Sequence, residues 1–183
     1  GTKKTTAKQK VDALKGYVWF LDRHFPYIAT RALSKRHERL WEWFDSLECG
    51  KPLPPRVEVW PRGGAKSSTA ELGCAYVGYK LTRRFCLYIS ETQDQADKHV
   101  QAIATLLERL GFTAAVNKEG HSKGWRRNQV RCSNGFNVAA LGLDTAARGI
   151  KLDEFRPDLI ILDDIDGRHD TPKTTGKKES SIT

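Results

Sequence analysis

The chain has 183 residues, of which 39% are hydrophobic and 29% charged, and its 31 basic and 22 acidic side chains give a net charge of +9. This composition is typical of a globular domain with its own core and excludes a disordered or membrane chain. No apolar run approaches the roughly 18 residues of a membrane span, and the start of the chain lacks the apolar centre of a signal peptide. The positive charge favours an anionic partner such as nucleic acid, although many basic domains bind none.

Two amphipathic helices are expected before residue 55. Residues 5–25 and 32–47 carry apolar side chains at helical spacing, and a proline-rich connector occupies 51–55. We therefore expect residues 1–55 to form a helical segment that packs on the domain that follows. The aromatic residues of the second helix either belong to the core or stack on an adenine base: Trp41, Trp43 and Phe44.

Beyond residue 55, strand-like and helix-like segments alternate. Short apolar runs predict strands over 57–60, 85–89 and 159–162. Helices are expected from about residue 69 to 81 and over 91–110. The second of these helices would have Ser90 as its N-cap and Gly111 as its stop signal.

An Asn134-Gly135 turn joins two further strand-like runs, which predicts a β-hairpin. Alternating strands and helices indicate an α/β fold with a mostly parallel sheet covered by helices on both faces. The continuous apolar run 159–162 is typical of a strand buried on both faces. The domain would occupy residues 56–170, and the polar composition of 171–183 indicates a disordered tail.

The four cysteines lack the spacing of a metal or redox motif. No Cys-x-x-Cys pair and no zinc-like combination of cysteine and histidine occurs in the sequence. A reducing compartment such as the cytosol is the expected environment: the cysteines are Cys49, Cys74, Cys86 and Cys132.

Residues 60–68, Trp-Pro-Arg-Gly-Gly-Ala-Lys-Ser-Ser, resemble the loop that binds nucleotide phosphates. The general pattern is Gly-x4-Gly-Lys-Ser/Thr, and this chain departs from it twice, with Trp60 and Ala65 at the glycine positions. The chemical requirements of the loop are better preserved than its sequence pattern, because two glycines can turn backbone amides toward an anion. The alternative is an ordinary turn with a solvated lysine. The expected nucleotide-binding residues are Arg62, Gly63, Gly64, Ala65, Lys66, Ser67 and Ser68.

A pair of acidic residues supports the nucleotide interpretation. Asp163 and Asp164 close the apolar run 159–162, so they should emerge at the carboxyl end of a strand, where α/β sheets bind ligands. Asp163 would share a Mg²⁺ ion with Ser67, and Asp164 would be the general base that polarises the attacking water. Nucleotide hydrolases of this kind usually carry Glu at the second position, and Asp is one methylene shorter.

Several segments resemble the large terminase subunits of tailed bacteriophages. The loop 61–67 is similar to the Pro-Arg-Gly-x-x-Lys-Ser loop of that family, and three later segments are similar in the same order: 88–96, 142–149 and 156–164. The resemblance covers about residues 38–172. It implies a P-loop ATPase motor that uses ATP and Mg²⁺ to drive double-stranded DNA into a procapsid.

The resemblance also implies partners and a location. We expect a homo-oligomeric ring on the portal protein, contact with the small terminase subunit, and no membrane association. The protein would act in the cytoplasm of the infected bacterial host and transiently at the procapsid portal. Family members carry a nuclease domain after the ATPase domain, so we expect this chain to contain the ATPase part with an altered or incomplete sheet, and not to cleave DNA.

Basic side chains supply candidates for catalysis and for DNA contact. Arg62 in the loop and Arg148 before the acidic strand are candidates for stabilising the transition state, and Arg83 and Arg84 are weaker ones. The densest basic stretch surrounds Trp125 and would contact phosphates without reading sequence. Alternatively, it is the charged edge of a hairpin. Its basic residues are Lys118, His121, Lys123, Arg126, Arg127 and Arg131.

Two other functions remain open from the residues. One is another nucleic-acid-stimulated ATPase with the same core. The other is a nucleotide-binding or assembly module with weak or no hydrolysis, which Asp164 in place of Glu favours.

Overall fold

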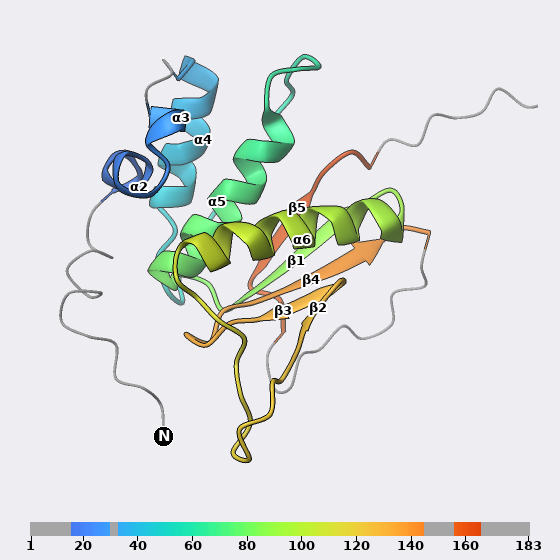
Figure 1. Ribbon diagram of the computed structural model, residues 1–183. Coiled ribbons are helices and arrows are strands. Elements are labelled where there is room, and N and C mark those ends of the chain that lie inside the picture. Colours follow the sequence, from blue (N-terminus) through green and yellow to red (C-terminus); the bar gives the residue numbers. More distant parts are fainter. Residues whose placement is uncertain (1–15, 30–32, 145–155, 166–183) are drawn as a thin grey trace, which may run out of the picture.

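The computed structural model describes residues 16–29, 33–144 and 156–165. Its helices precede or alternate with the strands along the chain (Figure 1). The predicted tail 171–183 and Arg148 lie outside the described residues. The helices are α2 (Tyr17–His24), α3 (Pro26–Ala29), α4 (Lys35–Asp45), α5 (Lys66–Lys80) and α6 (Gln93–Arg109), and the strands are β1 (Phe85–Ser90), β2 (Trp125–Arg126), β3 (Gln129–Arg131), β4 (Asn137–Gly142) and β5 (Leu159–Leu162).

The strands form one sheet in the order β2-β3-β4-β1-β5. The central strand β1 pairs in parallel with both β4 and β5, whereas β3 pairs antiparallel with β4 and with β2. The predicted hairpin around Asn134-Gly135 is therefore confirmed as β3–β4. The sheet is only partly parallel, because this hairpin and β2 extend it in the antiparallel sense.

A single core joins the helices to one face of the sheet. On that face, Cys86 and Tyr88 of β1 point toward α5 and α6, and the same cluster includes Phe20 and Trp41 from the N-terminal helices. Helix α5 is buried around much of its circumference, so it lies at the centre of this layer. Close packing depends on Gly73, because a Cβ there would lie 2.1 Å from the Phe44 ring.

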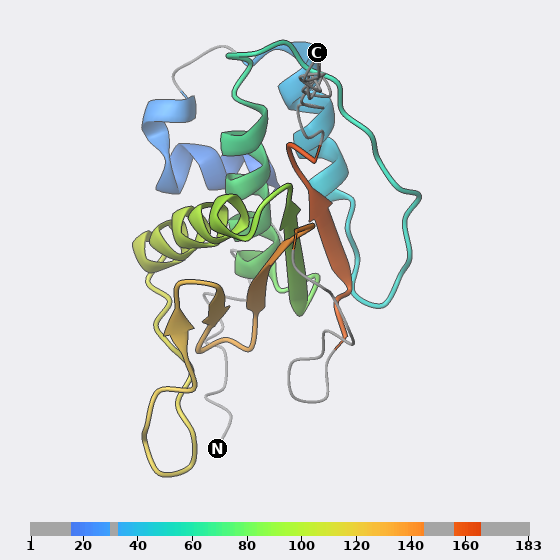
Figure 2. The same ribbon diagram turned by 90° about the vertical axis from the view of Figure 1, so that its right-hand side faces the viewer.

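The prediction of helices on both faces is wrong for the described residues. The opposite face of the sheet is a small cluster of strand residues, Phe85, Leu87, Ile89 and Ala139, with no described helix among its members. On β5, the side chains of Ile160 and Leu162 are 52% and 56% exposed, so this strand is not buried on both faces. Figure 2 shows the helical layer on one side of the sheet and β5 at its edge.

The strand predicted over residues 57–60 is also wrong. This segment belongs to a long connector between α4 and α5 that runs outside the sheet (Figure 2). Val57 and Val59 are 86% and 85% exposed. Alternating Val residues favour a strand only where a neighbouring strand satisfies the backbone groups, and no described strand pairs with this segment.

The predicted helices 69–81 and 91–110 are confirmed as α5 and α6, with differences at their starts. Helix α5 begins three residues earlier, at Lys66. The N-cap of α6 is Thr92, whose hydroxyl accepts a hydrogen bond from the Gln95 N–H, and Ser90 is the last residue of β1. Among the described helices, none is long and apolar enough to cross a membrane.

Candidate functional site

A left-handed turn leads directly into the amino end of α5. Gly63 has φ +78° and Ala65 has φ +57°, and the Gly64 N–H donates to the Pro61 carbonyl at 3.1 Å. The N-cap residue Ala65 has no polar side chain to accept from the first-turn N–H groups of the helix. Those N–H groups and the positive end of the helix dipole make this turn suited to an anion.

Lys66, the first residue of α5, lies against the two acidic residues that follow β5. Its Nζ is 2.9 Å from Asp163 Oδ1 and 3.2 Å from Asp164 Oδ1. The parallel pairing of β1 with β5 places the acids at the carboxyl edge of the sheet, beside the α5 start. Residues almost one hundred positions apart thus meet where the sequence predicts.

The two acids have different surroundings. The side chain of Asp163 is 3% exposed, whereas that of Asp164 is 68% exposed and its backbone has φ +48°. Burial alone would raise the pKa of Asp163, but hydrogen bonds with Ser67, Lys66 and Tyr88 outweigh it and hold that pKa below its usual value. The hydrogen bond to Asp163 in turn raises the pKa of Lys66. Both groups are therefore charged near neutral pH.

Asp163 has a third partner that sequence reasoning missed. The Tyr88 hydroxyl donates to Asp163 Oδ2 at 3.1 Å. Tyr88 stacks on His99 with ring centroids 4.8 Å apart, and His99 Nδ1 lies 2.7 Å from Glu71 Oε1. The position of Tyr88 on the same face of β1 as the core residue Cys86 was the available signal, but nothing in the sequence connects it with Asp163.

The predicted arginines divide into three groups. Arg62 is exposed within the loop, so its guanidinium is accessible to a ligand. Arg148 lies outside the described residues. Arg83 is buried, and its guanidinium donates to the carbonyls of Glu48 and Lys51, so it anchors the chain after α4. A catalytic role for Arg83 does not fit these contacts.

The adenine-stacking role considered for Trp41 and Phe44 does not fit the structure. Trp41 and Phe44 are 1% and 3% exposed and belong to the core. A small pocket of about 120 Å³ lies instead beside the loop. His37 lines this pocket. Its ring centroid lies 4.6 Å from that of Trp60, and its Nε2 lies 3.1 Å from the Gly64 carbonyl oxygen. Sequence reasoning missed the pocket, which is lined by Ser34, Arg36, His37, Trp60, Pro61 and Gly64.

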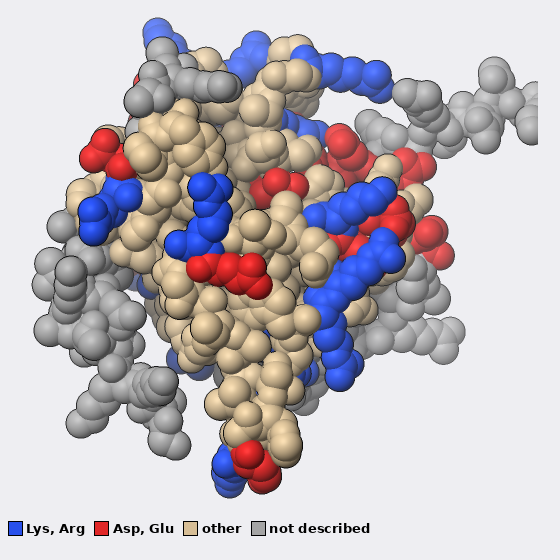
Figure 3. Space-filling model, in the orientation of Figure 1, with Lys and Arg blue, Asp and Glu red and all other residues tan. Residues whose placement is uncertain are grey.

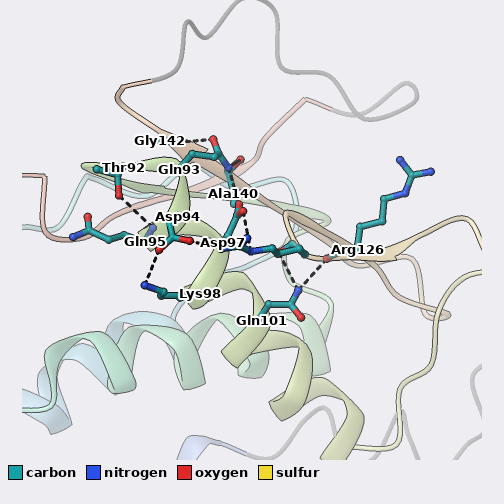
Figure 4. A network of polar contacts seen from close by, with 11 residues as sticks. Thr92, Gln93, Asp94, Gln95, Asp97, Lys98, Gln101, Arg126, Ala140 and Gly142 are labelled. Carbon is teal, nitrogen blue, oxygen red and sulfur yellow. Dashed lines mark hydrogen bonds and ion pairs between the residues drawn. The ribbon is translucent and has the colours of Figure 1, made fainter.

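Part of the basic stretch near β2 forms ion pairs with acidic side chains. Arg127 forms ion pairs with Asp94 and Asp97 at the start of α6. Figure 4 shows this network, from which the side chain of Arg126 extends away. On the face in Figure 3, basic and acidic side chains lie next to each other. Lys123 and Arg126 are exposed, and Arg131 is half-buried.

The donor set at the α5 start fits a magnesium–nucleotide complex better than a bare metal. Within the described residues there is no group of three or more His, Cys, Asp or Glu able to hold a metal ion. Mg²⁺ commonly takes one or two protein oxygens and completes its shell with phosphates and waters. Ser67, which follows Lys66 on α5, and Asp163, which lies 2.9 Å from Lys66 Nζ, supply such a pair of oxygens.

The comparisons with known proteins add no relative. No protein-family model, no curated protein and no solved structure matches this chain.

Proposed function

We propose that the chain is a P-loop ATPase that uses ATP and Mg²⁺ and acts as the motor of a viral DNA-packaging terminase. The single observation that carries the ATPase part is the contact of Lys66 with Asp163 and Asp164, directly after the left-handed turn of Gly63 and Ala65. A cation, two carboxylates and a helix amino end at one point are the groups that phosphoryl transfer needs. The terminase part is supported by the sequence resemblance alone.

Each residue has a distinct role in this proposal. The first-turn amides of α5 and Lys66 bind the phosphates, and Lys66 leaves the carboxylates to do so. Ser67 and Asp163 hold the Mg²⁺, which neutralises phosphate charge when bound. Asp164, exposed and adjacent, accepts the proton of the attacking water. Arg62 stabilises charge on the transferred phosphoryl group.

Further parts of the proposal concern partners and place. Lys123 and Arg126 contact the phosphates of double-stranded DNA. The neighbouring Arg127 and Arg131 add positive charge to the same surface. The assembled motor forms a ring on the portal protein, with the small terminase subunit, in the host cytoplasm. The pocket beside Trp60 and Gly64 lies next to the phosphate turn.

A second candidate is a nucleotide-binding or assembly module with little hydrolysis. The observation in its favour is that Asp164, shorter than the usual Glu, is held by Lys66 at 3.2 Å. Another nucleic-acid-stimulated ATPase is a third candidate that shares the same site.

The test is binding of Mg²⁺·ATP by wild type and two lysine variants. Lys66→Ala should weaken binding by about 100-fold or more, or about 2.7 kcal/mol, because the phosphates lose their cation. Lys80→Ala is the matched control. Lys80 is the last residue of α5, at the opposite end from Lys66, and it also forms an ion pair, with Asp45 at 2.8 Å. The affinity of Lys80→Ala should equal that of wild type.

The outcomes separate the candidates. Equal affinity of wild type and Lys66→Ala rules out the site. Tight binding without phosphate release, even with DNA present, favours the binding module. Hydrolysis that rises with any duplex DNA, regardless of its sequence, favours the motor.

A further inference from the structure

The buried carboxylate of Asp163 is held from two sides. Oδ1 lies 2.9 Å from Lys66 Nζ, and Oδ2 accepts a hydrogen bond from the Tyr88 hydroxyl at 3.1 Å. A carboxylate cannot rotate freely when one of its oxygens is hydrogen-bonded to a side chain of a neighbouring strand. The Tyr88 bond therefore keeps the other oxygen directed toward α5, where Lys66 and Ser67 lie.

Tyr88 is itself fixed by residues of both central helices. It has no exposed surface, and its ring lies nearly parallel to that of His99, at 24° and 4.8 Å. His99 on α6 is bonded to Glu71 on α5 at 2.7 Å. The tyrosine ring thus has one orientation in which its hydroxyl reaches Asp163.

These contacts close a circuit through four elements. Lys66 and Glu71 both belong to α5. From Lys66 the contacts run to Asp163 on the segment after β5, to Tyr88 on β1, to His99 on α6 and back to α5 at Glu71. The circuit ties the direction of the Asp163 carboxylate to the packing of α5 against α6.

We infer that Tyr88 is a positioning residue that orients Asp163 for the cation, and that His99 and Glu71 hold Tyr88 in place. This inference rests on the proposed Mg²⁺·ATP site. Groups that orient a metal ligand from behind typically change metal affinity by about 10- to 100-fold when removed. Tyr88 does not touch the nucleotide or the cation.

The chain offers a matched control in Tyr76. Tyr76 has no exposed surface, and its hydroxyl donates to a carboxylate, Asp45, at the opposite end of α5. Tyr76→Phe and Tyr88→Phe therefore remove the same group from equally buried rings. A merely structural role would give the two variants the same profile.

The experiment measures the Mg²⁺ concentration that half-saturates ATP binding by the full chain, with a fluorescent ATP analogue as the probe. We expect Tyr88→Phe to require about tenfold more Mg²⁺ while binding the metal-free nucleotide as wild type does. Tyr76→Phe should keep the wild-type Mg²⁺ requirement. His99→Gln, which keeps the Tyr88 hydroxyl but removes its ring contact, should give a smaller shift in the same direction.

Each result has one meaning. A wild-type Mg²⁺ requirement in Tyr88→Phe overturns the inference and leaves the proposed function intact. An equal shift in both tyrosine variants assigns Tyr88 a structural role only and also overturns it. If wild type does not bind Mg²⁺·ATP, the proposed function fails, and the inference with it. Should Tyr88→Phe not fold, the shift in His99→Gln decides between these outcomes.

Discussion

The two ends of helix α5 carry the same three groups in very different settings. At the carboxyl end, Lys80 lies 2.8 Å from Asp45, which also accepts from the Tyr76 hydroxyl. At the amino end, Lys66 and the Tyr88 hydroxyl also share a carboxylate, but they contact different oxygens of Asp163, whereas Lys80 and Tyr76 both contact Asp45 Oδ1. Lysine, aspartate and tyrosine thus recur at both ends of one helix.

The helix dipole distinguishes the two ends. A cation in the last turn is stabilised by the negative end of the dipole, whereas a cation at the first residue faces the positive end. Lys80 therefore stabilises α5, and Lys66 does so less or not at all. Since the amino end also exposes N–H groups to an anion, the groups there are better explained by ligand binding than by stability.

The first prediction exchanges one carboxylate at each end. Asp163→Asn should weaken Mg²⁺-dependent ATP binding by about 100-fold, or about 2.7 kcal/mol. Asp45→Asn should leave binding unchanged and lower the free energy of unfolding by about 1–2 kcal/mol, because two donors lose a charged acceptor. Urea unfolding and nucleotide titration of both variants check this. The comparison breaks if Asp45→Asn weakens binding as much as Asp163→Asn.

The second prediction perturbs the middle of the helix. Gly73→Ala would place a methyl group 2.1 Å from the Phe44 ring, so the packing of this ring and of α4 against α5 must change. The free energy of unfolding should fall by about 1–3 kcal/mol. At a temperature where the variant is folded, its affinity for Mg²⁺·ATP should stay within about threefold of wild type, or about 0.65 kcal/mol. Wild-type stability would show that α4 is not packed on Gly73.

The smallest expected effect concerns pH and His99. The hydrogen bond with Glu71, and the charges of Asp163 and Asp164, raise the pKa of His99 against the opposing effect of burial. A raised folded-state pKa stabilises the protein below the unfolded value of about 6.5, and this contribution disappears as the pH rises through the folded value.

The stability difference between wild type and His99→Gln should accordingly shrink between pH 6 and pH 9. This stability difference should be under about 1 kcal/mol, since His99 and Glu71 form a single, partly exposed ion pair. Chemical unfolding at several pH values measures it. A difference that grows with pH would mean that His99 is held neutral, and that the contact with Glu71 is not an ion pair.

The fold could be predicted wherever the signal was local. Helices α5 and α6, the central strand β1 and the hairpin around Asn134-Gly135 follow from periodicity and turn residues. The strand over 57–60 could not be judged in this way, because alternation describes a side-chain pattern but not the presence of a pairing partner. The burial of β5 could not be predicted for the same reason, because it depends on which elements cover that face of the sheet.

The site was predictable in part. The meeting of Lys66 with Asp163 follows from a general property of parallel sheets, whose strands end at one edge beside helix amino ends. The link from Tyr88 through His99 to Glu71 was not predictable. Its members lie on three elements, and only their packing brings the rings and carboxylates into contact.

The sequence by itself determined the local elements, the turn at Gly63 and the identities of the charged groups at the carboxyl edge, because these depend on short-range propensity and on chemistry. Tertiary structure alone decided which strands pair, which face of the sheet the described helices cover and which side chains surround Asp163. These depend on contacts between distant residues, and a burial pattern along one chain does not specify the partner across the contact.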